Sequence, residues 1–264
     1  MKIFSFKTIS ISMSLLITFL LLIAVLSLFF VPKIGDIINA LRSGEMIYSI
    51  KLSLITSLLS TFFVLIFSVP IAYALSRYDF FGKSILKTII NLPMAFPELV
   101  LGLSLLLLFS KTFVGDFFDE LGIQIVFTKA GIVVAQFFTA LPYGIRIIYS
   151  SFESVNKRYE YVSRSLGYGE FETFKNVLVP LIRNGIYASA IITFARSMGA
   201  FGAVLILAGG SYMKTEILPI TLFLNISYGN MGMAITSGIV LIVISFVAIL
   251  SVEYMEGKEN VFKD

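Results

Sequence analysis

Two ionisable residues, Glu98 and Arg196, stand inside stretches of sequence that are otherwise strongly apolar. A carboxylate or a guanidinium held away from water usually pairs with another charge or faces a polar cavity. Two hypotheses follow. In the first, Glu98 and Arg196 form an internal ion pair that braces two helices. In the second, Arg196 lines a passage and gives an anion a favourable but weak contact, and Gly199 and Gly202 keep that neighbourhood open.

The composition excludes most other chemistry. The 264 residues contain no Cys and no His, which removes disulfides, Cys-ligated metal sites, thiol nucleophiles and the usual general base. No set of nucleophile, base and orienting residue converges in the sequence, so a membrane enzyme is disfavoured. The net charge is +4, and the basic residues are scattered over segments that flank apolar stretches. This distribution indicates orientation in a bilayer rather than nucleic-acid binding. We expect no catalytic residue, metal site or cofactor on this chain.

Hydrophobic residues make up 58% of the chain and charged residues only 14%, which is typical of an all-α integral membrane protein. We expect one transmembrane domain, residues 1–264, with the chain embedded in lipid. A signal peptide is disfavoured for the first stretch, because its apolar run is too long and no small-x-small cleavage site follows. The sequence predicts six membrane-spanning helices, at residues 9–31, 48–75, 89–109, 130–149, 185–209 and 233–252.

Two of these predicted spans carry special residues. The third contains Pro93 and Pro97, which each remove a helical hydrogen bond, so we expect a broken or kinked helix that faces the protein interior. The fifth is rich in small residues, which let helices approach closely and predict a packing or pathway element. A short helix is expected within residues 111–129, and a loop over 210–231.

The longest polar interval, residues 153–184, has its own periodicity. Four apolar residues recur at helical spacing, Gly167 can end that helix in the left-handed conformation, and a second apolar face follows before Pro180. The pattern predicts two short helices around a glycine hinge. An amphipathic loop lying on the lipid surface is the alternative. The two apolar faces are Val155, Tyr159, Val162 and Leu166, then Phe171, Phe174 and Leu178.

The same interval resembles the EAA signature of ABC importer permeases, which is Glu-Ala-Ala, three residues, Gly, nine residues, Ile-x-Leu-Pro. Gly167 and Pro180 fall in register, and residues 161–163 and 177–179 occupy the other positions. Tyr161 stands where the family usually has the glutamate, and Glu160 precedes it. Further segments look like the permeases of molybdate, tungstate or sulfate importers, although Ala200 stands where many relatives have an acidic residue. These segments are residues 137–142, 151–155, 195–203 and 215–219.

The resemblance implies a homodimer of this chain, two cytoplasmic ATPase subunits and an external substrate-binding protein. It implies a cytoplasmic coupling loop between the fourth and fifth spans, with Leu166, Phe171 and Phe174 as apolar anchors in a groove of the ATPase and Glu160 paired with Arg164. The chain has no phosphate-binding loop, so ATP and Mg²⁺ are expected on the partner. The expected coupling residues are Glu160, Tyr161, Arg164, Ser165, Leu166, Gly167, Phe171, Phe174 and Pro180, and the expected pathway residues are Arg196, Gly199, Gly202, Glu98, Pro93 and Pro97.

Basic residues indicate the orientation. Of twenty Lys and Arg residues, thirteen lie on the side that holds both termini and the polar interval, six lie on the other side, and Arg196 lies within a span. The positive-inside rule makes the richer side cytoplasmic in a multi-pass protein of the cell membrane. The resemblance implies that the transported anion is molybdate or tungstate. Permeases for sulfate or thiosulfate, polyamines or iron remain alternatives, as does a structural or signalling membrane protein, which would not explain the Gly and Pro register.

Overall fold

The computed structural model describes residues 6–260, with side chains up to residue 251. Every regular element in this part of the chain is helical, as predicted. The elements are α1 (Phe6–Phe30), α2 (Ile34–Arg42), α3 (Gly44–Arg77), α4 (Lys83–Ala95), α5 (Glu98–Lys111), α6 (Phe113–Glu120), α7 (Lys129–Ser154), α8 (Arg158–Ser165), α9 (Glu170–Thr173), the π-helical turn η1 (Phe174–Leu178), α10 (Val179–Leu181), α11 (Arg183–Met198), α12 (Gly202–Ala208), α13 (Leu218–Ser227) and α14 (Met231–Asn260).

Four helices among the described residues, α1, α3, α7 and α14, are each long and apolar enough to cross a membrane. Two further spans are possible if each of two bent pairs crosses once, which gives up to six. In the first pair α4 meets α5 at 114°, with the break at Phe96 and Pro97, so the predicted break is confirmed. In the second pair the segment ending at Leu181 meets α11 at 70°.

The prediction of a continuous fifth span over residues 185–209 is wrong. Helix α11 ends at Met198 and α12 begins at Gly202, so the chain is interrupted between them. The segment over 210–231 also differs from expectation, because it contains the apolar helix α13. The short helix expected within residues 111–129 is present as α6.

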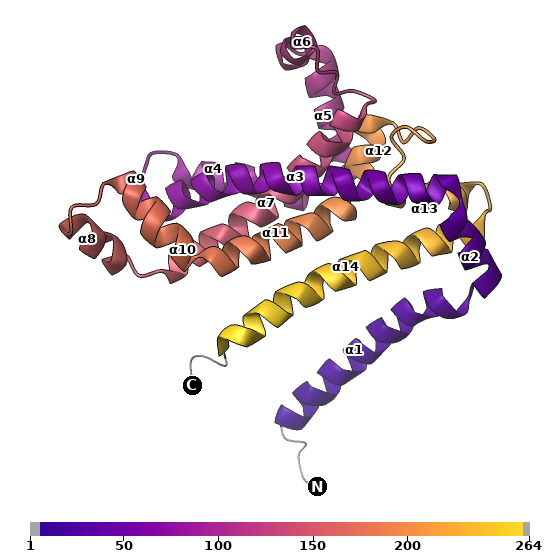
Figure 1. The fold of residues 1–264 in the computed structure, drawn as a ribbon, viewed down its shortest axis with the longest axis horizontal. Coiled ribbons are helices and arrows are strands. Elements are labelled where there is room, and N and C mark those ends of the chain that lie inside the picture. Colours follow the sequence, from indigo (N-terminus) through magenta and orange to yellow (C-terminus); the bar gives the residue numbers. More distant parts are fainter. Residues whose placement is uncertain (1–5, 261–264) are drawn as a thin grey trace.

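Helices α3, α7 and α11 form the centre of the bundle (Figure 1). Buried hydroxyl residues on α3 let these helices approach closely, as small side chains do in lipid. The Gln136 amide on α7 donates to Ser57 Oγ at 3.2 Å and to the carbonyl of Ser197 on α11 at 3.0 Å. Gly144 on α7 also marks a close approach, because a Cβ there would lie 2.6 Å from Val64 Cγ1.

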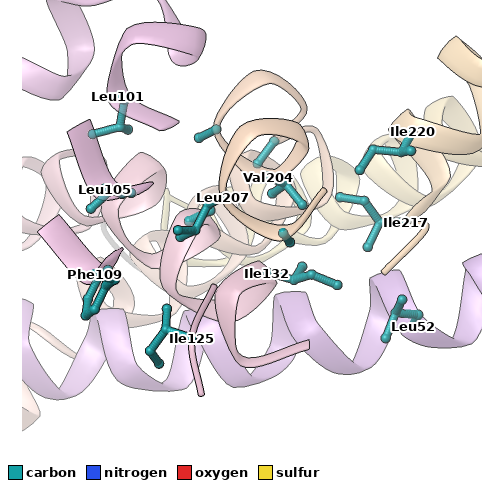
Figure 2. Packing of buried hydrophobic residues seen from close by; sticks show 14 residues of the cluster. Leu52, Leu101, Leu105, Phe109, Ile125, Ile132, Val204, Leu207, Ile217 and Ile220 are labelled. Carbon is teal, nitrogen blue, oxygen red and sulfur yellow. The ribbon is translucent and has the colours of Figure 1, made fainter. Parts of the chain in front are cut away.

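A second packing centre surrounds α12. Figure 2 shows Val204 and Leu207 between the α5 residues Leu101, Leu105 and Phe109 on one side and Ile217 and Ile220 on the other. The helices touch closely here, because a Cβ on Gly102 of α5 would lie 2.9 Å from Ala203 Cα. Helix α14 packs on α11 and α13, whereas α1 lies beside α14 and buries no residue.

The two ends of the bundle carry different elements (Figure 1). One end holds the start of α1, the end of α14, the α3–α4 connection and the segment from α8 to α10. The other end holds α2, the start of α3 and α13. Helix α6 lies apart from both ends, at the tip of α5 (Figure 1).

Candidate functional site

The polar interval folds as two helical pieces joined at Gly167. Gly167 has a φ of +92°, and a Cβ there would meet nothing within 4 Å, so backbone conformation alone requires glycine. The Tyr168 amide reaches back to the carbonyl of Ser163 at 3.3 Å, which closes the end of α8. The Gly169 amide donates to the Glu172 carboxylate at 2.8 Å and starts α9. The predicted hinge is confirmed.

The predicted pairing of Glu160 with Arg164 is wrong. Glu160 faces inward from α8 and pairs with Arg77 at the end of α3, with 2.5 Å between Nε and Oε1 and side-chain exposures of 9% and 5%. These two atoms lack the alignment of a hydrogen bond, so the contact is an ion pair. Arg77 also donates to the carbonyl of Val155 at 3.0 Å. Arg164 instead lies 3.6 Å from the Glu170 carboxylate, with both side chains about half exposed.

Tyr78, which follows α3, makes a second link to this segment. Its phenol donates a hydrogen bond to the Glu170 carboxylate. That hydrogen bond, followed by partial burial, raises the pKa of Tyr78 above its ordinary value. The end of α3 and the residue that follows it are therefore tied to both helical pieces of the polar interval, through Glu160 and through Glu170.

The three predicted anchors lie in different surroundings. Leu166 and Phe171 are 74% and 73% exposed, and Tyr161, Ser165 and Pro180 are also exposed. Phe174 is half-buried instead, because its ring packs against Tyr73 of α3 and Phe152 of α7, so it is less accessible to a partner than the other two anchors. A hollow of about 610 Å³ lies beside α8, and its lining includes Tyr159, Val162, Leu166, Tyr168 and Val177.

At membrane depth, the hypothesis of an ion pair between Glu98 and Arg196 is wrong. One oxygen of Glu98 accepts hydrogen bonds from the amides of Phe201 and Gly202, each at 3.0 Å. Arg196 is exposed, donates to the hydroxyl of Tyr143 at 2.8 Å and stacks over that ring at 4.4 Å. Each charge has therefore found a different partner.

The prolines and glycines of the predicted pathway lie in different parts of the structure. Pro93 lies inside α4, and Pro97 is the residue before α5, so the prolines flank the bend between the two helices. Gly202 is buried, and a Cβ there would lie 3.0 Å from the Leu99 amide, so the expectation that it keeps a space open is wrong. Gly199 is exposed and lines an apolar hollow of about 370 Å³.

Arg77 was not predicted from the sequence, because nothing in the spacing of residues links the end of α3 to α8.

Glu216, in the segment 215–219 singled out above, is 1% exposed, and burial followed by the nearby Glu45 raises the pKa of its carboxyl. Within the described residues, no group of three or more acidic side chains is placed to hold a metal ion.

Comparison with known proteins identifies relatives over most of the chain. Residues 65–260 match the family described as binding-protein-dependent transport system inner membrane component. The molybdate/tungstate transport system permease protein WtpB of Methanocaldococcus jannaschii is 35% identical over 82% of this chain and 84% of its own length. The sulfate transport system permease protein CysT of Salmonella typhimurium is 28% identical over 83% and 80%. The probable transport system permease protein NifC of Clostridium pasteurianum is 32% identical over 83% and 77%.

Solved structures support the same fold. A bacterial alginate ABC transporter, crystallised with a periplasmic protein that carries an alginate pentasaccharide, matches with a TM-score of 0.72 over 93% of this chain and 92% of that one. The methionine ABC transporter MetNI matches with a TM-score of 0.57 over 81% and 97%. Both are 17% identical and so bear on the fold alone. This chain belongs to the binding-protein-dependent inner membrane components, the permease subunits of type I ABC importers.

Proposed function

We propose that this permease moves a tetrahedral oxyanion, molybdate or tungstate, into the cytoplasm. It would act as a homodimer with two ATPase subunits, which bind ATP and Mg²⁺, and with an external protein that delivers the anion. The relative at 35% identity carries molybdate/tungstate in its name, which supports this substrate class. Sulfate is the second candidate, because the CysT relative carries sulfate in its name.

The observation that carries the proposal is the exposure of Arg196 and its lack of a carboxylate partner among the described residues. Its guanidinium is exposed near the end of α11, and its partner is the phenol of Tyr143 rather than a carboxylate. A guanidinium held against a neutral ring keeps its full charge and several free N–H donors, which suit the oxygens of a tetrahedral anion. A charge at this depth must face protein or water rather than lipid, and a second copy of the chain would supply that cover.

The polar interval would couple transport to ATP hydrolysis. Leu166 and Phe171 are the exposed apolar side chains that an ATPase groove would take up, and the hollow beside α8 would receive side chains from that partner. Phe174 would act from inside, because it fixes η1 on the bundle. Motion of the ATPase pair would reach α3 through Glu160 and Arg77.

Uptake by the complete reconstituted complex tests this function. Tungstate and molybdate should each be taken up with ATP. Each should inhibit uptake of the other more strongly than sulfate does. Arg196→Gln should assemble normally and transport about tenfold more slowly, since a lost charged hydrogen bond costs roughly 1.5 kcal/mol. Arg196→Lys should recover part of the rate. Absence of uptake of all three anions by the wild-type complex would overturn the oxyanion assignment, and wild-type uptake by Arg196→Gln would remove Arg196 from the pathway.

A further inference from the structure

A second basic site lies on α7, nearer the polar interval than Arg196. It is a hollow of about 530 Å³ between α3, α4 and α7. Its polar lining consists of Lys87 and Asn91 from α4 and Arg146 and Tyr149 from α7. None of its lining residues is acidic; the apolar ones are Leu75, Ile90, Met94, Ala95 and Ile145.

The two cations of this hollow are not neutralised by carboxylates. Lys87 Nζ donates to the hydroxyl of Tyr149 at 2.8 Å and lies 4.3 Å from the centre of its ring. Arg146 is exposed and makes no ion pair or hydrogen bond with any side chain that the structure describes.

Three carboxylates of the neighbouring segments are engaged outside the hollow. Glu153 of α7 accepts a hydrogen bond from Ser76 at 2.8 Å. Asp79 pairs with Lys83 at 2.8 Å, and this contact lowers the pKa of Asp79. Glu160 pairs with Arg77. The hollow therefore keeps an excess of positive charge and presents an ammonium, a guanidinium and an amide, which together suit an oxyanion.

The arrangement repeats along α7. Arg196 stacks on Tyr143, Lys87 stacks on Tyr149, and Arg146 stands midway between the two tyrosines in sequence. Six residues of helix rise about 9 Å, and Tyr143 and Tyr149 point about 120° apart around α7, so an anion released from Arg196 would move along and around this helix to the second site. Closely spaced weak sites let an anion enter and leave a passage without being trapped.

We propose that the hollow lined by Lys87, Asn91, Arg146 and Tyr149 binds a tetrahedral oxyanion at the inner end of the route from Arg196. The identity of that anion as the transported substrate rests on the function proposed above. The phosphate of an acidic lipid headgroup presents the same oxygens and is the other source of this chemistry. The hollow is large enough for either group together with bound water.

Site occupancy is measured directly in this naturally Cys-free chain. Ala95→Cys, at the exposed margin of the hollow, is labelled with a thiol reagent in the complete complex in nanodiscs, and the modification is read on this chain. In phosphatidylcholine alone, tungstate at about ten times its dissociation constant should slow labelling roughly tenfold. Adding Arg146→Gln or Lys87→Gln should remove the protection, and Arg146→Lys should keep most of it.

Lys83→Gln is the matched control, because Lys83 lies one turn before Lys87 on α4 but pairs with Asp79 outside the hollow. It should leave protection unchanged. Protection by phosphatidylglycerol, lost in Arg146→Gln, together with none by tungstate would support the oxyanion site with lipid as its source and overturn the substrate route. Labelling that neither tungstate nor phosphatidylglycerol slows would overturn the site. If that complex still imports tungstate, the proposed function stands without it.

Discussion

Glu160 and Tyr161 are neighbours on α8 that lie in different surroundings. Glu160 is buried against Arg77, whereas Tyr161 is 66% exposed. Glu160 therefore serves the contact between α8 and α3. Tyr161, at the position where the EAA signature has glutamate, presents an aromatic ring to the outside. The outward surface of α8 presents Tyr159, Tyr161 and Val162 together with the basic residues Arg158 and Arg164.

Removal of one member of the Arg77–Glu160 pair should destabilise the permease strongly. Glu160→Ala leaves the Arg77 charge buried without a carboxylate, which typically costs about 3–5 kcal/mol. The thermal unfolding temperature of the purified complex should fall accordingly. Arg77→Met combined with Glu160→Leu should recover much of the loss, because no unpaired charge remains.

Arg164→Ala is the control for this experiment. It breaks the half-exposed contact with Glu170, which is worth about 0–1 kcal/mol. An equal loss of stability in Arg164→Ala and Glu160→Ala would show that burial of the Arg77–Glu160 pair has no special role.

At the scale of elements, the connection between α8 and α9 holds two glycines with different backbone conformations. Gly167 has a φ of +92° and Gly169 a φ of −67°. Gly167→Ala should strain the hinge by about 1–2 kcal/mol without any clash, since a Cβ there meets nothing. We expect substrate-stimulated ATP hydrolysis to fall while the permease still inserts in the membrane. Gly169→Ala should behave like wild type, and equal loss in both variants would remove the special role of the left-handed hinge.

The sequence predicted those elements whose causes are local. The lengths of apolar runs predicted the long helices α1, α3, α7 and α14, Pro97 predicted the bend before α5, and Gly167 predicted the hinge. The break between α11 and α12 was not predictable in this way. It contains no proline, and it is stabilised by Glu98, more than a hundred residues earlier.

In the candidate site too, the features with local causes were predictable and those set by distant segments were not. Helical spacing placed Phe171 and Phe174 on one apolar face, but the partial burial of Phe174 depends on Tyr73 and Phe152, which come from other helices. The partners of Glu160 and Arg196 likewise lie on distant segments. Spacing along one helix identifies which charges share a face, and it leaves open the competing partners that packing brings near.

At the scale of the whole molecule, the segments that lie at each end of the bundle predict which side of the membrane they face. Glu172 and Ser211 are both exposed, and they belong to segments near opposite ends of the bundle (Figure 1). Single cysteines at these positions should label from opposite sides of the membrane, with Glu172→Cys protected in intact cells until they are permeabilised. The positive-inside rule gives this direction. Labelling of both positions by an impermeant reagent in intact cells would contradict six crossings.

Glu98 joins the two interrupted parts of the chain at one point. It is the first residue of α5, and its carboxylate holds the first amides of α12, where Gly102 and Ala203 bring the two backbones together. The interruptions after α4 and after α11 therefore meet in a single mechanical joint. We expect α5 and α12 to move together, because Glu98 and the close backbone contact join them. A displacement at either interruption would then reach both helices at once.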